Sequence, residues 1–395
     1  MALYAQHGHG KSDRIIAAAA TGDVQGVIFG ARNEKSANLV SCIGSLRAEY
    51  ELDILLDPQF YVSTLNPPNE GYLTEYPYYT SGLAAADFVG SRRLRQYAQD
   101  TLAYQADLDV TRLVSPSVIF DSFEDRWFQI ALSLADASLE CVASLNVAAP
   151  LLLTFVLAEQ CLSSRRELDV FLDQLTAWEM KGIYLLVARE ESSYSQRFEP
   201  QRLANLMYLI HVLSHLNDFE VIVGYSDFCG LLLRAVGAAA FATGWNQSLR
   251  QFCRRSFIRQ RPGGKLPRLR YSSAPLLNSI LLSELDQTFD VGDLEIILSG
   301  IPLDSVITSA VRPGASDWNR RISDLHHWQT LHKLDEKIAK KPSEDLTQIE
   351  AAIEAASAIY EIVQADGVIF ERNSQGQHLE DWTQAIQLFR QLVNL

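Results

Sequence analysis

Five acidic residues stand at or just after apolar stretches, at positions where a strand would end. They are Asp57, Asp121, Glu159, Glu190 and Asp227. Side chains that follow the strands of an α/β fold gather at one rim of its sheet, where ligands bind. Carboxylates held close together raise each other's pKa, which suits general acid–base catalysis or cation binding. We interpret the five as candidate catalytic residues; the alternative is that they cap the helices that follow.

A strongly basic segment, residues 248–270, lies in an otherwise acidic chain, whose net charge is −14. The segment contains no acidic residue, and its basic residues are Arg250, Arg254, Arg255, Arg259, Arg261, Lys265, Arg268 and Arg270. Arginine binds the oxygens of phosphate in pairs through its planar fork. The segment also follows the last clear predicted strand, and the final loops of a (β/α)8 barrel commonly hold phosphate. It is therefore predicted to bind the phosphates of a nucleotide or nucleic acid; a solvated surface loop is the alternative.

Aromatic residues close to these positions are candidates for stacking on a nucleic-acid base. Tyr72 and Tyr76 lie in a tyrosine-rich loop over residues 66–82, and Trp245 ends a predicted strand. Aromatic rings on such loops stack on bases or sugars. They also pack loops onto a barrel or hold a partner subunit, and the sequence leaves these alternatives open.

Metal and cofactor sites have little support in the sequence. His211 and His215 are spaced to hold a metal on one helix face, but no third ligand accompanies them. The motifs GxSxG, HExxH and GxGxxG are absent, and GHGKS at residues 8–12 lacks the first glycine of a phosphate loop. We therefore predict neither a metal nor a cofactor.

Apolar runs alternate with helical patterns along the chain up to residue 276. The predicted strands cover residues 26–31, 52–57, 112–120, 150–159, 182–188, 219–225 and 238–245, with a weaker one at 266–273. These runs are apolar throughout rather than alternating, which is typical of parallel strands covered on both faces. Repeated strand–helix units over about 250 residues predict an α/β fold, a (β/α)8 TIM-like barrel. An open, doubly wound sheet is the alternative.

The barrel is predicted to span residues 26–276, between two regions of different character. Residues 1–25 are predicted to form an N-terminal tail. Residues 277–395 carry amphipathic patterns at helical spacing, which predict an all-helical C-terminal appendage. This appendage is a candidate for docking a protein partner.

The composition is that of an ordinary soluble protein, with 48% of the 395 residues hydrophobic and 21% charged. The acidic balance argues against nonspecific DNA binding over the whole surface and leaves residues 248–270 as the place for a nucleic acid. The five cysteines lie far apart, as expected in a reducing compartment. No stretch has the length of a signal-peptide core or a membrane span. We predict a cytoplasmic protein without membrane contact.

Several strand ends resemble those of the tRNA-guanine transglycosylase-like (β/α)8 barrels, over roughly residues 26–245. The stretch ILLDPQFYVSTL, with Asp57, lies where that family has an essential aspartate, and VIFDSFED, with Asp121, resembles its strand-ending aspartate that reads the guanine edge. Gln160 in TFVLAEQ lies near the family's base-reading glutamine. The resemblance implies the same barrel and an enzyme that acts on a base and its sugar.

The sequence departs from this family at two chemical positions. The nucleophilic aspartate that would end the seventh predicted strand is replaced around Ala242 and Thr243, and the zinc-binding cysteines are absent. Without that nucleophile, covalent base exchange lacks its reacting group. An active form would be a degenerate transglycosylase-like enzyme.

Three hypotheses follow for the function. The first is a barrel protein that binds a nucleic acid or nucleotide through residues 248–270, with Asp57 and Asp121 acting on a base or sugar. The second is a non-catalytic scaffold or interaction subunit of a larger complex. The third is a carboxylate- or metal-dependent hydrolase of a small phosphorylated or glycosidic substrate, using two of Asp57, Asp121, Glu159 and Glu190. Whether the protein is an enzyme stays open at this point.

Overall fold

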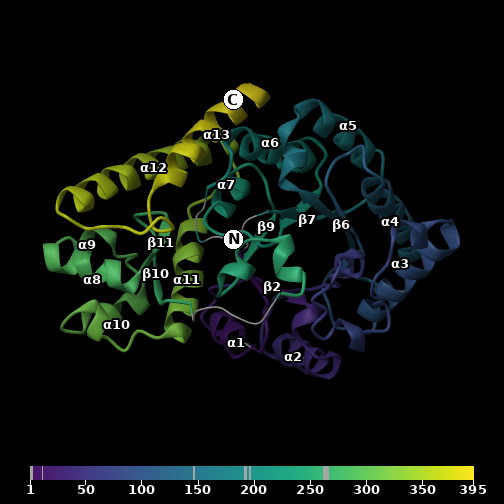
Figure 1. Ribbon diagram of the computed structural model, residues 1–395, viewed down its shortest axis with the longest axis horizontal. Helices are drawn as coiled ribbons and strands as arrows, with labels where there is room; N and C mark the ends of the chain where they lie inside the picture. Colours follow the sequence, from purple (N-terminus) through teal and green to yellow (C-terminus); the bar gives the residue numbers. More distant parts are fainter. Residues whose placement is uncertain (1–2, 11, 146, 191–193, 195–196, 261–266) are drawn as a thin grey trace.

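The computed structural model describes residues 3–10, 12–145, 147–190, 194, 197–260 and 267–395. Its centre is a ring of parallel strands (Figure 1). The strands are β1 (Leu3–Gln6), β2 (Gly26–Gly30), β3 (Asp53–Asp57), β4 (Leu113–Val114), β5 (Ile119–Phe120), β6 (Leu151–Ala158), β7 (Gly182–Ala188), β8 (Glu220–Val223) and β9 (Ala240–Thr243). They pair in the order β3-β2-β1-β9-β8-β7-β6-β4, and β5 also pairs with β6.

The two ends of this order meet, so the sheet is nearly closed. The backbone N–H of Thr111 donates to the Ile54 carbonyl across 2.8 Å, which joins β3 to the residues just before β4. Leu55 and Arg112 form a parallel bridge at the same place. The predicted (β/α)8 TIM-like barrel is therefore confirmed, and the open sheet is excluded.

Residues 3–6 form β1, one of the strands of the barrel wall, so the predicted N-terminal tail is wrong for this stretch. β1 is buried and pairs in parallel with β2 on one side and β9 on the other. Its four residues, LYAQ, form too short an apolar pattern to stand out in the sequence. The strand expected at 266–273 is also not part of the ring. β10 (Arg270–Ser273) pairs antiparallel with β11 (Asn278–Leu281) in a separate hairpin.

Helices surround the ring of strands (Figure 1). They are α1 (Ser12–Ala20), α2 (Ser36–Glu49), α3 (Ser91–Ala106), α4 (Arg126–Val142), α5 (Arg165–Thr176), α6 (Pro200–His211), α7 (Gly230–Ala235) and α11 (Arg320–Asp335). α11 packs on β1, α1 and α7 and so fills the eighth helix position. Polar caps begin some of these helices; the Asp125 carboxylate accepts from the backbone N–H of Phe128 across 2.7 Å.

The chain between β9 and α11 is an insertion into the barrel. It carries the β10–β11 hairpin, α8 (Leu282–Val291), α9 (Leu294–Ile297) and α10 (Ser305–Thr308), which lie together on one side in Figure 1. The boundary predicted at residue 276 falls inside this hairpin. Residues 277–395 are therefore neither all-helical nor separate, because β11 belongs to the hairpin and α11 to the barrel.

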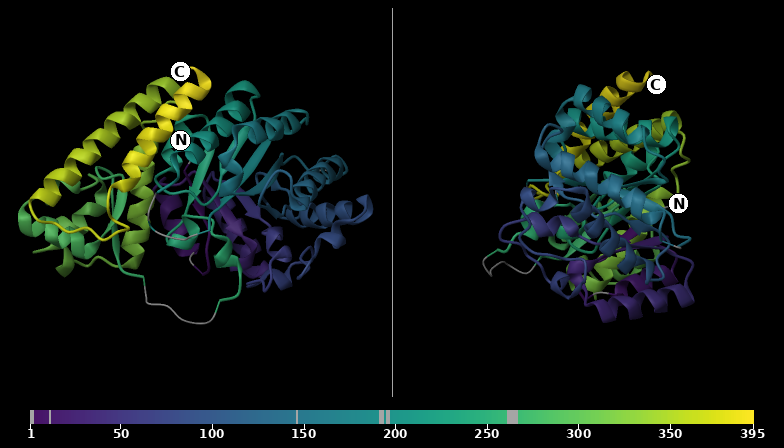
Figure 2. Two further views of the ribbon diagram at one scale, coloured as in Figure 1. Left: turned by 45° about the horizontal axis from the view of Figure 1, so that its top comes forward. Right: turned by 90° about the vertical axis from the view of Figure 1, so that its right-hand side faces the viewer.

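The last two helices form a pair on the outside of the barrel. α12 (Pro342–Ala365) and α13 (Gln377–Val393) run side by side, with α12 against α7 and α13 against α6 (Figure 2). Within the described ranges, none of the helices has both the length and the apolar character that crossing a membrane requires.

Charged side chains meet inside the amino-terminal end of the barrel. Arg112 donates to Glu220 across 3.1 Å and to Asp53 across 2.5 Å. The Tyr4 hydroxyl donates to Asp53 as well. These contacts link the amino-terminal ends of four strands, β1, β3, β4 and β8. The interior becomes polar again only at the carboxyl-terminal end of the strands, where the candidate site lies.

Candidate functional site

Asp57 ends β3 inside the carboxyl-terminal mouth of the barrel and is fully buried. Its Oδ1 accepts a hydrogen bond from the backbone N–H of Gln59 across 2.9 Å, and its Oδ2 accepts one from the Tyr61 hydroxyl across 2.9 Å. Burial raises the pKa of Asp57 to about 7, against the opposing effect of these hydrogen bonds. A carboxyl with this pKa both gives and takes protons near neutral pH.

Polar side chains from neighbouring strands surround this carboxyl. The Tyr184 hydroxyl lies 3.5 Å from Asp57 Oδ2, and Thr154 stands beside Tyr184 in the register of β6 and β7. Gln6 lies next to the Tyr184 hydroxyl, yet within the described part of the chain neither Gln6 nor the Thr154 hydroxyl completes a side-chain hydrogen bond of good geometry. Buried polar atoms without partners are uncommon. The mouth thus holds a carboxyl group with a raised pKa beside side chains with unused hydrogen-bonding capacity.

Residues 249–259, which we call the cover segment, fold back over this mouth. Phe252 and Phe257 stack on each other with ring centroids 4.8 Å apart. They pack edge-on against Tyr61, at 5.1 and 5.4 Å, and against Tyr225, at 5.3 and 6.3 Å. The backbone N–H of Arg189 donates to the Phe252 carbonyl across 2.8 Å and holds the segment in place. The direct route from solvent to the buried carboxyl therefore passes through the cover segment.

The other predicted carboxylates lie apart from one another. Asp121 forms an ion pair with Arg254 of the cover segment through two hydrogen bonds, of 3.2 and 2.5 Å. Glu159 binds Arg189 across 2.7 Å, and Glu190 is exposed. The expectation that these acids converge at one place is not met. Burial, rather than a second carboxylate, raises the pKa of the carboxyl in the mouth.

Asp227 takes part in the contact between the barrel and α11. His327 Nε2 lies 3.3 Å from Asp227 Oδ1, and His327 Nδ1 lies 2.9 Å from the Ser272 hydroxyl. The order Ser–His–Asp is that of a hydrolase relay, but all three side chains are buried. Burial lowers the pKa of His327 to about 4, so the ring is neutral near neutral pH. We assign these contacts to joining the barrel, the hairpin and α11.

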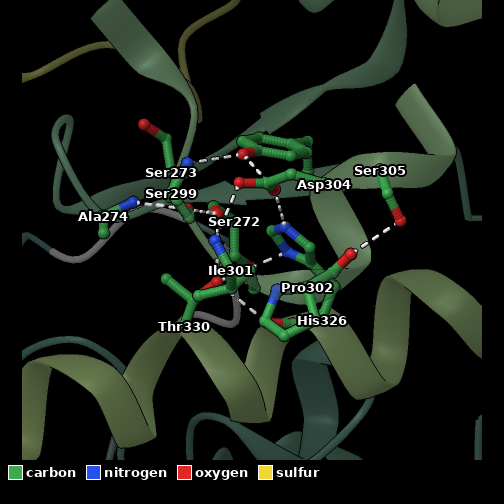
Figure 3. A network of polar contacts seen from close by, with 12 residues as sticks. Ser272, Ser273, Ala274, Ser299, Ile301, Pro302, Asp304, Ser305, His326 and Thr330 are labelled. Carbon is green, nitrogen blue, oxygen red and sulfur yellow. Dashed lines mark hydrogen bonds and ion pairs between the residues drawn. The ribbon is translucent and has the colours of Figure 1, made fainter. Parts of the chain in front are cut away.

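A second buried network joins the hairpin to α11 (Figure 3). Asp304 Oδ1 accepts from the Tyr271 hydroxyl across 2.7 Å and lies 2.8 Å from His326 Nε2. Asp304 Oδ2 accepts from the backbone N–H of Ile301 across 3.0 Å. The Ser299 hydroxyl donates to the backbone of β10 across 2.6 Å. Together the two networks fix the position of the hairpin, which carries part of the basic segment.

Two buried arginines lie side by side where the hairpin meets the barrel rim. Arg250 donates to the Gly244 carbonyl across 3.0 Å, and Arg270 donates to the Ser279 carbonyl across 2.6 Å. Their guanidinium carbons lie 5.9 and 4.4 Å from the centre of the Tyr194 ring. Burial lowers the pKa of Arg270, and the positive charge of Arg250 adds to this effect. Arg250 also lies 3.9 Å from the carboxylate of the buried Asp227, whereas Arg270 forms no ion pair with a described residue.

A pocket of about 560 Å³ opens beside this pair, and we call it the arginine–tyrosine pocket. It is lined by Tyr194, Gln247, Pro267, Arg268, Arg270, Leu281 and Asn373. A smaller cavity of about 30 Å³ shares Tyr194, Arg268 and Arg270 with it and extends to Arg250. Arg268 is exposed at the rim and pairs with Glu371. Arginines beside an aromatic ring and side-chain amides form a surface that suits a phosphate and a base.

The other described basic residues of the segment do not gather around the arginine–tyrosine pocket. Arg254 is held in its ion pair over the mouth. Arg255 and Arg259 are exposed, and neither forms an ion pair with a described residue. Arg261 and Lys265 lie outside the described residues. The described part of the basic segment is thus divided between two structures, the cover segment and one wall of the arginine–tyrosine pocket.

The aromatic residues predicted to stack on a base have different environments. The Tyr76 hydroxyl donates to the Glu34 carbonyl across 2.8 Å, and both Tyr76 and Trp245 are buried. Their burial supports the alternative in which these rings pack loops onto the barrel. Tyr72 is half-buried. The ring that lies beside the arginines is Tyr194, which the sequence did not single out, because one tyrosine in a loop forms no pattern.

Metal binding has no support in the described part of the chain, which contains no group of three or more residues able to ligate an ion. The rings of His211 and His215 lie 4.9 Å apart, but no third ligand completes a site with them there.

Comparisons with known proteins identify no family for this chain. No protein-family model matches the sequence, and no curated protein matches it. Among solved structures, the chain is similar to a glycosyl hydrolase of the GH3 family from Mycobacterium smegmatis, with a TM-score of 0.37 and 14% identity, over 61% of this chain and 82% of that chain. A similarity of this size carries no functional argument. The resemblance to transglycosylase-like barrels stays a prediction.

Proposed function

We propose that the protein binds a phosphate-bearing ligand, a nucleotide or the end of a nucleic acid, in the arginine–tyrosine pocket. The observation that carries this proposal is the pair of Arg250 and Arg270, two buried cations against one tyrosine ring. Among the described residues Arg270 forms no ion pair; its partners are the Ser279 carbonyl and the Ser374 hydroxyl. Buried charges are normally paired. A bound phosphate would supply the negative charge that Arg270 lacks, since Arg250 already lies 3.9 Å from Asp227.

The rest of the pocket favours a nucleotide over inorganic phosphate. Its volume of about 560 Å³ exceeds what a phosphate group needs and falls in the range of ligand sites. Tyr194 offers an aromatic ring for stacking on a base. Gln247 and Asn373 offer amides that both donate and accept hydrogen bonds.

We place proton transfer at Asp57, which would act as a general acid or base on the base or sugar of this ligand. The support is its pKa of about 7 and its burial beside side chains with unused hydrogen-bonding capacity. The cover segment connects the two places, because Arg250 lines the smaller cavity that shares residues with the pocket and Phe252 lies over the mouth. Arg250 and Phe252 also line, together with Tyr225, a cavity of about 30 Å³. A ligand that binds Arg250 therefore acts on the segment that covers Asp57.

The other two hypotheses have different support. A hydrolase that uses two of the predicted carboxylates is disfavoured, because Asp121 and Glu159 are each engaged by an arginine. A non-catalytic scaffold is the second candidate, since the chain's own aromatic rings cover Asp57. Ligand binding that leaves the ligand unchanged, and that is indifferent to Asp57→Asn, would favour the scaffold.

Binding of a fluorescent adenine nucleotide and of a 5′-phosphorylated oligonucleotide, followed by anisotropy over a series of salt concentrations, tests the proposal. Arg268→Ala should weaken binding by about tenfold and reduce its salt dependence, because one phosphate contact is lost. Arg270→Lys, which keeps the charge but not the fork, should weaken it as well.

Arg95→Ala is the matched control, since Arg95 is also an exposed arginine in an ion pair, with Glu140 at 2.7 Å on the far side of the barrel helices. It should leave binding unchanged. Absence of binding at low salt, or equal affinities for the Arg268, Arg270 and Arg95 variants, would contradict the proposal.

A further inference from the structure

An apolar cavity of about 320 Å³ lies between the barrel and the α12–α13 pair. Its walls come from α7, the turn of the β10–β11 hairpin, α11, α12 and α13. Its apolar lining includes Leu231, Leu232, Leu277, Leu334 and Ile349. It shares no lining residue with the arginine–tyrosine pocket, so a ligand here is independent of the function proposed above.

The size of this cavity is itself informative. Protein interiors are packed to the density of organic crystals, and a void of this size leaves many side-chain atoms without contacts. An apolar cavity of about 150 Å³ already binds benzene, and ligand sites begin at about 300 Å³. Water is poorly held where the lining offers few hydrogen-bond partners. The cavity therefore suits the hydrocarbon body of a small molecule.

Two polar groups of the lining indicate what else such a molecule carries. The Trp382 ring is buried, and its Nε1–H has no acceptor among the described residues. Lys337 is exposed at the edge of the cavity and forms no ion pair with a described residue. The carboxylate of Asp345, also in the lining, accepts from the backbone N–H groups of Ala339 and Lys341 at 2.9 and 2.8 Å. The lining thus offers an ammonium group and an N–H donor to an anionic ligand.

The space continues on the other side of Lys337. A second cavity, of about 380 Å³, shares Leu277, Leu334, Lys337 and Ala352 with the first. Its other cation, Lys333, is already bound to two backbone carbonyls at 2.8 and 2.9 Å. The slot between α11 and α12 is therefore longer than either cavity alone, which favours an extended chain over a compact ring system.

We propose that this slot binds a small amphipathic acid, with a medium-length hydrocarbon chain among the leucines and a carboxylate paired with Lys337. The chain would fill space that the protein's side chains leave empty, which contributes both burial and dispersion energy. The carboxylate would gain an ion pair at the edge, where it keeps part of its hydration. An oxygen of the ligand would accept the hydrogen bond that Trp382 Nε1–H lacks.

Titration of the full-length chain with decanoate, hexanoate and decanol by calorimetry tests the proposal. Decanoate should bind, and each CH₂ added between hexanoate and decanoate should tighten binding by about fourfold. Decanol should bind more weakly than decanoate. Lys337→Met should remove this preference for the acid, and Lys337→Arg should retain it.

Two tryptophan substitutions on α12 provide a matched pair. Ala352→Trp places a ring in the slot and should weaken decanoate binding by about tenfold or more. Ala358→Trp lies on the exposed face of α12, lines neither cavity and should leave binding intact. The proposal is overturned if decanoate does not bind, if chain length has no effect, or if these two variants bind alike. Should Ala352→Trp fail to fold, as judged by circular dichroism, the Lys337 variants decide the question.

Discussion

The Tyr61 hydroxyl and the Asp57 carboxyl group form a hydrogen bond of 2.9 Å in the mouth of the barrel, and both side chains are buried. The phenol favours the ionised carboxylate, whereas burial favours the protonated acid. Burial prevails, and the pKa of Asp57 rises to about 7. Burial also raises the pKa of Tyr61 well above its usual range, so this phenol remains a hydrogen-bond donor at any physiological pH. The protonation of Asp57 is therefore sensitive to whatever covers the mouth.

Replacing Asp57 by asparagine should change how stability depends on pH. The pKa of this carboxyl is about 7 in the folded chain against an ordinary value of 3.8, so its stabilising contribution is complete below pH 3.8 and is lost as the pH rises through 7. Asp57→Asn abolishes this loss. Relative to the wild type, its free energy of unfolding should increase by on the order of 4 kcal/mol between roughly pH 4 and pH 8. Urea unfolding measures both proteins; a difference that does not vary with pH would refute the expectation.

Removing an aromatic side chain from the cover segment should expose the carboxyl-terminal mouth of the barrel to solvent. Phe252→Ala should lower the free energy of unfolding by about 3 kcal/mol, because Phe252 is buried against three other rings. Residues 53–65, which include the Gln59 N–H bound to Asp57, should exchange hydrogen for deuterium faster, as measured by mass spectrometry. Phe155→Ala is the control, since Phe155 is also buried but lies on β6 and packs against Phe171 of α5. Equal protection of residues 53–65 in the two variants would count against a cover.

The whole chain should unfold in a single transition. Arg234 of α7 donates to Asp335 of α11 across 2.9 Å, and Arg14 of α1 donates to Asp324 of α11 across 2.6 Å. Because α11 follows the insertion and fills the eighth helix position around the strands, the insertion and the barrel depend on each other. Calorimetry should show one peak with equal calorimetric and van't Hoff enthalpies. Asp335→Ala should lower the midpoint by leaving a buried arginine unpaired, again with one peak. Two separate peaks would instead support the predicted division into a barrel over residues 26–276 and an independent region over residues 277–395.

The network around Asp304 should be a major source of stability for the hairpin. Asp304→Ala removes the acceptor of three hydrogen-bond donors and should cost about 3 kcal/mol in urea unfolding. Burial alone would raise the pKa of Asp304, but hydrogen bonds from His326 and Tyr271 outweigh this effect, and the pKa is lowered. This contribution is therefore present above pH 3.8, the ordinary value, and is lost as the pH falls below it. Asp290→Ala, at an exposed carboxylate 3.1 Å from Arg312, should cost less than about 1 kcal/mol. Equal costs for the two would be the contrary result.

Much of the barrel could be predicted because its longer strands carry their own pattern. β6 and β7 are continuous apolar runs of eight and seven residues, which only a sheet covered on both faces explains. β1 and β10 could not be placed in this way. Both are four residues long, and what distinguishes a barrel strand from a hairpin strand is its partner, which lies far away in the sequence. A helix was expected where α11 lies, but its place as the eighth helix of the barrel was missed, because an insertion separates it from β9.

The candidate site could likewise be predicted only in part. Asp57 could be found because it ends a predicted strand, and Arg250 and Arg270 because they belong to a segment without acids. The burial of both arginines, and their contact with Tyr194, depend on loops that fold from three separate parts of the chain. The cover over Asp57 could not be foreseen either, since Phe252 looks like any apolar residue in a loop until its partners are known.

The place of β1 in the ring has a consequence for how the protein is made. Among the strands of the barrel, β1 is synthesised first, and β2 soon follows to pair with it. The second partner, β9, is synthesised only after all the other barrel strands. Until then β1 presents an unpaired edge, which is a site for wrong pairing with other chains. Closure of the ring is thus a late event of biosynthesis, and the nascent chain is most vulnerable to aggregation just before β9 emerges.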